Sequence, residues 1–86
     1  MDNSERIARL RARLEQALAP TALEIHDDSS RHAGHEGARD GRGHFTVTIA
    51  SPVFAGLSPV AKHRKIYDAV GDMMQTDIHA LAIRAS

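Results

Sequence analysis

Residues 54–81 read FAGLSPVAKHRKIYDAVGDMMQTDIHAL, and this stretch decides the fold that the sequence predicts. Gly56 suits a turn, Ser58 suits a helix N-cap, and Pro59 suits the first helical position. Side chains recurring every three or four residues then predict one packed helix face, made of Val60, His63, Tyr67, Val70 and Met74. The helical pattern ends after this face, and residues 78–83 read as a short strand.

A second amphipathic helix is predicted near the N-terminus, ended by Pro20. Its apolar stripe consists of Ile7, Leu10, Leu14 and Leu18. Its other side carries Arg6, Arg9, Arg11 and Arg13. These arginines form either a phosphate-binding face or a solvated helix exterior, and we favour the solvated exterior because charge runs on helices usually face water.

Two segments alternate between apolar and polar residues, as half-buried strands do. Residues 21–28 and 44–50 are expected to pair antiparallel across a flexible polar loop at residues 29–43, SSRHAGHEGARDGRG. The inward side chains are Leu23, Ile25, Phe45, Val47 and Ile49. The outward side chains are Glu24, His26, His44, Thr46 and Thr48, and neither outward histidine is given a role.

The predicted order is therefore helix, strand, strand, helix, strand. We expect residues 1–86 to form a single small α+β domain. One three-stranded sheet with both helices on one face would bury every apolar surface. The open face of that sheet would carry Glu24, His26, Thr46 and Thr48.

Composition excludes several classes of function. The chain has no cysteine, which rules out a disulfide scaffold, a thiol nucleophile and a cluster held by its own thiolates. Its formal net charge is +0, which argues against general electrostatic binding of nucleic acid. No apolar run approaches a membrane span, and no catalytic set or nucleotide-binding fingerprint emerges. We expect a cytoplasmic, non-enzymatic binding module with no membrane contact.

Histidines are the candidate metal ligands, because imidazole binds zinc, copper, nickel or iron. His32 and His35 form an H-x-x-H motif in the loop, and are either solvated or a pair of ligands. His63 falls on the predicted apolar stripe, where a structural role is favoured. His79 opens the last strand; by strict alternation it shares a face with Leu81 and Ile83, at the sheet's end.

Three short motifs together resemble the BolA family. They are Phe54-x-Gly56, Lys62-His63-Arg64 and Ile78-His79-Ala80-Leu81. The loop sequence from Ser30 to His35 resembles the histidine version of the family's variable loop, and His44-Phe45 also matches. This resemblance implies a fold related to the class II KH domain, in agreement with the predicted element order.

The same resemblance implies a partner and a cofactor. BolA-like proteins pair with monothiol glutaredoxins, and the heterodimer holds a bridging 2Fe–2S cluster to which glutaredoxin and glutathione supply sulfur ligands. Carried over to this sequence, His79 of the H-A-L motif is a ligand, and either His32 or His35 is a second ligand. The implied role is iron–sulfur trafficking or iron regulation.

Two alternatives stay open beside this role. A KH-like, DNA-binding transcriptional regulator would use the basic cluster Lys62, His63, Arg64 and Lys65, which equally suits a protein partner. Against it, Gly56 is followed by Leu57, Ser58 and Pro59, so the second glycine of a G-x-x-G loop is absent. The other alternative is metal binding by His32 and His35 without a glutaredoxin. Homodimer formation is also left open.

Overall fold

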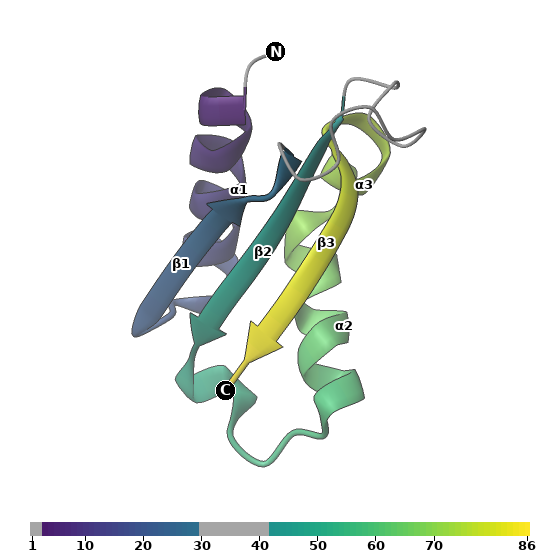
Figure 1. Ribbon diagram of the computed structural model, residues 1–86. Coiled ribbons are helices and arrows are strands. Elements are labelled where there is room, and N and C mark those ends of the chain that lie inside the picture. Colours follow the sequence, from purple (N-terminus) through teal and green to yellow (C-terminus); the bar gives the residue numbers. More distant parts are fainter. Residues whose placement is uncertain (1–2, 30–41) are drawn as a thin grey trace.

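A computed structural model of the protein describes residues 3–29 and 42–86. The elements follow the predicted order, with a short 3-10 helix and a short α-helix added (Figure 1). They are α1 (Asn3–Leu18), β1 (Ala22–Asp27), β2 (Gly43–Ala50), η3 (Pro52–Phe54), α2 (Pro59–Val70), α3 (Met73–Thr76) and β3 (Ile78–Ala85). The three predicted strands are thus confirmed to within two residues at each end. No helix in the described ranges has both the length and the apolar character needed to cross a membrane.

The sheet has three strands in the order β1-β2-β3, and the helices lie on one of its faces (Figure 1). β1 pairs antiparallel with β2, as predicted, with Leu23 opposite Ile49. β2 pairs parallel with β3, with Val47 opposite Ile83. A parallel pair needs a long crossover, which α2 and α3 supply here.

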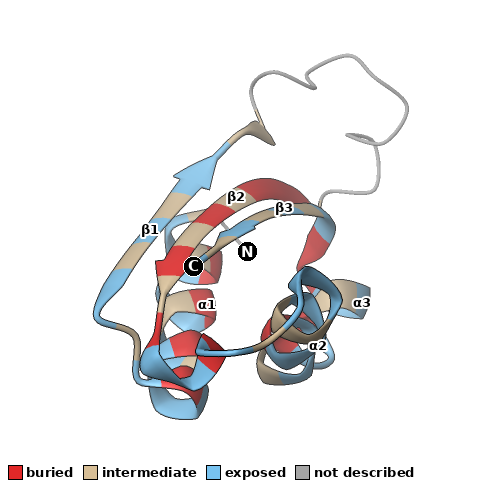
Figure 2. Cartoon of the chain, turned by 90° about the horizontal axis from the view of Figure 1, so that it is seen from below, coloured by how far each residue is buried: buried red, intermediate tan, exposed pale blue. Residues whose placement is uncertain are grey.

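The hydrophobic core lies between the sheet and the helices. Figure 2 shows buried residues concentrated on β2 and on the surface of α1 that faces it. The core side chains are Leu10, Leu14, Leu18, Phe45, Val47, Ile49, Phe54, Ile66, Val70, Met73 and Ile78. The predicted inward residues of β2 and most of the predicted α1 stripe are therefore confirmed; Ile7 packs against the core from its margin.

The capping signals of α2 act as the sequence predicts, but the helix buries a different face. The Ser58 side chain accepts a hydrogen bond from the Ala61 N–H, and Pro59 occupies the first turn. Ile66 and Val70 are fully buried, whereas Val60 is 61% exposed.

Tyr67 is 41% exposed and His63 is exposed, so the predicted apolar stripe is wrong for three of its five members. Ile66 lies one position before Tyr67, a rotation of about 100° around a helix with 3.6 residues per turn. That rotation buries a fully aliphatic side chain and leaves the tyrosine hydroxyl in water. His63 is therefore not a core histidine.

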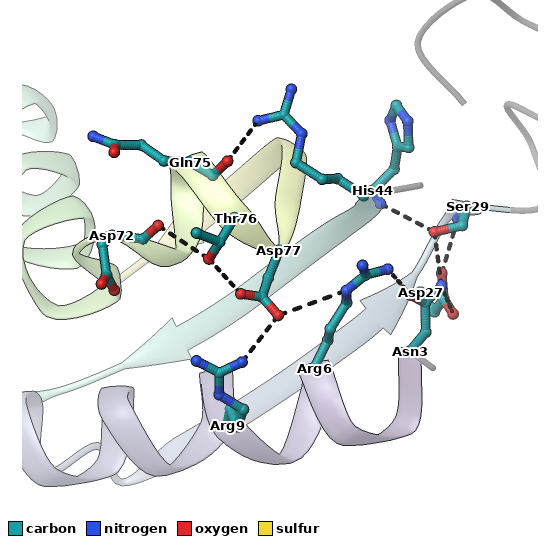
Figure 3. Close-up of polar contacts among 11 residues, drawn as sticks. Asn3, Arg6, Arg9, Asp27, Ser29, His44, Asp72, Gln75, Thr76 and Asp77 are labelled. Carbon is teal, nitrogen blue, oxygen red and sulfur yellow. Dashed lines mark hydrogen bonds and ion pairs between the residues drawn. The ribbon is translucent and has the colours of Figure 1, made fainter. Parts of the chain in front are cut away.

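The arginines of α1 are not the purely solvated helix exterior that the sequence favoured. Arg6 is only 9% exposed, and its Nε lies 3.7 Å from the Asp77 carboxylate. Arg9 Nη1 lies 3.0 Å from the same carboxylate (Figure 3). Arg13 pairs with Asp72 at 3.0 Å. The sequence pattern does not contain these pairs, because they form where α1 lies beside the two ends of α3, with Asp72 at its start and Asp77 at its end.

Candidate functional site

An irregularity at the start of β3 sets the position of His79. Gly43 of β2 pairs with Ile78, but the next residue, His44, pairs with Ala80. His79 is therefore the extra residue of a bulge in β3. Bulges commonly re-aim a side chain at the end of a sheet.

The bulge corrects the predicted alternation. Ile78 is fully buried, and Leu81 and Ile83 pack against the core, but His79 is exposed. Under strict alternation, His79 would share the core face of Leu81 and Ile83. The bulge instead leaves the imidazole at the surface, at the end of the sheet.

Within the described residues, Arg42 and His44 lie against His79. Arg42 Nη2 is 3.2 Å from His79 Nδ1. The rings of His44 and His79 have centroids 5.0 Å apart and an interplanar angle of 48°. His44 is only 5% exposed, so it is buried although strand alternation places it on the same face as Thr46 and Thr48. It is the second residue of the central strand, where its carbonyl accepts the Asp28 N–H on one side and its ladder partner on β3 is Ala80.

The described chain on either side of residues 30–41 ends beside this pair of histidines. The His44 N–H donates to Ser29 Oγ at 3.0 Å (Figure 3), and the Asp28 N–H donates to the His44 carbonyl at 2.7 Å. Arg42, on the other side, contacts His79. His32 and His35 themselves lie outside the described residues.

Asp27 stabilises the contact between Ser29 and His44. Its carboxylate accepts the Ser29 N–H at 2.9 Å and the Asn3 side-chain amide at 3.0 Å. Burial acts to raise the pKa of Asp27, but these hydrogen bonds and the charge of His44 outweigh it, and the pKa is lowered. The Asp27 carboxylate therefore accepts a hydrogen bond that holds Ser29 in place, and the Ser29 hydroxyl in turn accepts the His44 N–H.

The basic cluster lies elsewhere, on α2. His63, Arg64 and Lys65 are exposed and Lys62 is half-buried. β3 begins near α3, whereas α2 begins at the opposite end of the molecule (Figure 1). The structure thus does not join this cluster to His79 in one site.

The described part of the chain does not form a complete metal site. Within residues 3–29 and 42–86, no group of three or more histidine, aspartate or glutamate side chains is placed to hold an ion. A metal centre that uses His79 would need ligands from outside these ranges.

The open face of the sheet confirms the predicted polar surface and adds to it. A shallow hollow of about 360 Å³ lies over this face. It is lined by Glu24, His26, Asp28, Thr46, Thr48 and Arg84. Sequence reasoning missed Arg84, which follows the predicted end of the last strand, and Arg42, whose approach to His79 depends on the pairing of β2 with β3.

Comparison with known proteins identifies the family. Residues 14–86 match the protein family described as BolA-like protein. This chain belongs to the BolA-like family. The resemblance carried by the three sequence motifs is thereby confirmed, and the class II KH-like architecture expected from it is compatible with the observed sheet and helices.

Among BolA-like relatives, the chain is 44% identical over 82 residues to SufE-like protein 1, chloroplastic/mitochondrial, of Arabidopsis thaliana. It is 41% identical over 78 residues to BolA-like protein 1 of Mus musculus. These matches cover 90% and 91% of this chain, but only 22% and 55% of the two relatives. The chain thus spans about a fifth and about half of their lengths.

Solved structures agree with the BolA-like fold. The BolA domain of SufE1 from Arabidopsis thaliana superposes with a TM-score of 0.81 at 42% identity, covering 94% of this chain and 90% of that one. The solution structure of BolA1 from Mus musculus gives 0.75 at 40% identity, covering 92% and 62%. The predicted α+β fold is confirmed by these likenesses.

Proposed function

We propose that this BolA-like protein is a non-enzymatic partner of a monothiol glutaredoxin and supplies His79 as a ligand to a bridging 2Fe–2S cluster. The observation that carries the proposal is the bulge of β3, which leaves the His79 imidazole exposed at the end of the sheet. A ligand shared between two proteins must be at the surface of each. His79 meets that requirement.

The donor set of the chain fits a shared cluster better than one held alone. Without cysteine, the chain offers nitrogen or oxygen to iron, and imidazole is the better match. The remaining ligands would be sulfur atoms from glutaredoxin and glutathione. Mixed cysteine and histidine ligation occurs in 2Fe–2S proteins and tends to raise the cluster's reduction potential.

A second ligand from this chain would be His32 or His35. Ser29 and Arg42, which flank that segment, contact His44 and His79 respectively. Both flanks therefore start from the end of the sheet where His79 lies, which supports a loop histidine as its co-ligand.

A reconstitution tests the proposal. The protein is mixed with a monothiol glutaredoxin, glutathione, iron and sulfide under anaerobic conditions, and visible absorption and circular dichroism are recorded. We expect a distinct cluster spectrum at a one-to-one ratio of the two proteins. His79→Ala should abolish that spectrum. His26→Ala is the matched control, because His26 is also an exposed strand histidine but lies on the open face of β1.

The outcomes separate the partner from the ligand. If the wild-type protein forms no complex and no new spectrum, the glutaredoxin proposal is wrong. If the wild type converts the spectrum and His79→Ala does so equally well, only the ligand assignment is wrong. His32→Ala and His35→Ala, tested singly, would then assign the loop ligand. Far-UV circular dichroism confirms that each variant is folded.

A DNA-binding regulator is the second candidate function. It is supported by the exposed His63, Arg64 and Lys65 on α2. Binding to duplex DNA that weakens steeply with salt, and that Arg64→Ala and Lys65→Ala reduce at every sequence tested, would support this function. If neither substitution affects DNA binding, this surface of α2 is excluded as the DNA-binding site.

The cytoplasmic location stays a prediction. The name of one relative contains the words chloroplastic/mitochondrial, and this describes that protein. Localisation of a tagged full-length protein in its own cell would decide it.

A further inference from the structure

Arg42 joins His79 to the end of α3. Its Nη1 lies 3.3 Å from the Met74 carbonyl oxygen and 3.4 Å from the Gln75 carbonyl oxygen. Its Nη2 lies 3.2 Å from His79 Nδ1. One guanidinium thus bridges the last turn before β3 and the imidazole at the bulge.

The chemistry of this contact decides which nitrogen of His79 carries the proton. A guanidinium has only donors, so His79 Nδ1 must accept the hydrogen bond. In a neutral imidazole with Nδ1 as acceptor, the proton is on Nε2. Metal ions bind the unprotonated nitrogen, which here is the same Nδ1 that Arg42 occupies.

We propose that Arg42 is a positioning residue that holds His79 Nδ1 in a non-ligating state, so that a metal cluster gains this nitrogen only when Arg42 releases it. The inference rests on the proposed function of His79 as a cluster ligand. Arg42 and iron compete for one lone pair. The arginine therefore lowers the affinity of the free protein for metal and makes loading depend on an event, such as partner docking, that moves it.

The surroundings of Arg42 favour a fixed contact. The carbonyls that hold Nη1 belong to a turn whose next residue, Asp77, is buried and paired with Arg6 and Arg9 of α1. The Asp77 N–H also donates to the Met73 carbonyl at 2.9 Å. Because the turn is anchored in this way and the guanidinium is planar, Nη2 is directed at His79.

Nitrogen-15 NMR of the free protein tests the contact without any partner. At about pH 8, where an ordinary histidine is neutral, long-range proton–nitrogen correlation spectra report the state of each ring nitrogen. We expect an unprotonated, hydrogen-bonded Nδ1 and a protonated Nε2 for His79. Arg42→Met should move the Nδ1 signal towards that of a free imidazole, and Arg42→Lys should restore it in part. No change in Arg42→Met would overturn the inference.

Arg84→Met is the matched control for charge. Arg84 is an exposed arginine on β3, at the open face, and its removal changes the net charge by the same amount. If Arg84→Met shifts the His79 signals as much as Arg42→Met does, the effect is general electrostatics and the inference is wrong.

A glutaredoxin titration then tests the consequence. We expect Arg42→Met to lower the concentration of protein needed for half-conversion of the cluster spectrum by about two- to tenfold, the effect of one competing hydrogen bond. Arg84→Met should leave it unchanged. Equal midpoints for Arg42→Met and wild type would overturn the inference while leaving the proposed function intact. Failure of the wild type to form the cluster would instead overturn the proposed function. The NMR result would still show whether Arg42 contacts His79 Nδ1 in the free protein.

Discussion

Asp77→Asn should destabilise the protein through the buried ion pairs that join α1 to the turn before β3. The Asp77 side chain is 5% exposed, and its Oδ2 lies 3.0 Å from Arg9 Nη1 and 3.7 Å from Arg6 Nε. Its Oδ1 accepts a hydrogen bond from the Thr76 hydroxyl at 2.5 Å (Figure 3). Asparagine has nearly the same size, but it removes the charge and turns an amide donor towards a guanidinium.

The magnitude depends on how far each arginine is exposed. Breaking a buried ion pair by removing one partner costs about 3–5 kcal/mol. Arg6 approaches that case, since its side chain is 10% exposed, but its Nη1 keeps a hydrogen bond to Asn3 Oδ1 at 3.0 Å. Arg9 is 43% exposed, and such pairs contribute about 0–1 kcal/mol. We expect a loss of about 2–3 kcal/mol, or a melting temperature about 8–24 °C lower for a domain of this size.

Urea unfolding followed by far-UV circular dichroism at neutral pH measures this loss. Asp72→Asn is the matched control: Asp72 pairs with Arg13 at the same distance of 3.0 Å, but its side chain is 74% exposed. It should cost at most about 1 kcal/mol. If the two variants lose the same free energy of unfolding within about 0.5 kcal/mol, burial does not control these ion pairs, and the reasoning fails.

The other predictions concern pH, the orientation of α2 and the end of α2. The hydrogen bond from the Thr76 hydroxyl, followed by the charges of the arginines, lowers the pKa of Asp77 below 3.8 against the opposing effect of burial. The stability that Asp77 contributes is therefore complete well above pH 3.8 and lost as the pH falls through the lowered pKa, so the wild type and Asp77→Asn should converge in acid. Ile66→Ala should cost about 2–5 kcal/mol and Val60→Ala less than about 0.5 kcal/mol in urea unfolding; equal losses would refute the observed face of α2. Gly71→Ala should cost about 1–3 kcal/mol, because Gly71 has φ +61° and a Cβ there would lie 3.1 Å from an arginine nitrogen; an unchanged melting temperature would contradict this.

Local signals in the sequence predicted much of the fold. Ser58 and Pro59 mark the start of α2 by capping chemistry that involves only neighbouring residues. α2 ends at Gly71, whose positive φ is a conformation that glycine adopts readily. The alternation of Phe45, Val47 and Ile49 specified the buried face of β2 and hence the polar open face.

The orientation of α2 about its own axis could not be predicted from the local sequence pattern. Val60 and Tyr67 on one side, and Ile66 and Val70 on another, both satisfy helical spacing. Only packing against the sheet and α1 selects between them. The tertiary fold also brings Asp72 and Asp77, at the two ends of α3, to arginines of α1 that the sequence pattern favoured as solvated.

By itself, the sequence determined the element order, the family and the presence of a histidine at the head of the last strand. The tertiary structure alone decided what surrounds that histidine. The bulge at His79, the burial of His44 and the approach of Arg42 all depend on the register between β2 and β3. Register joins residues more than thirty positions apart in the chain, and a shift of one residue moves a side chain to the other face of a sheet. No local periodicity contains that information.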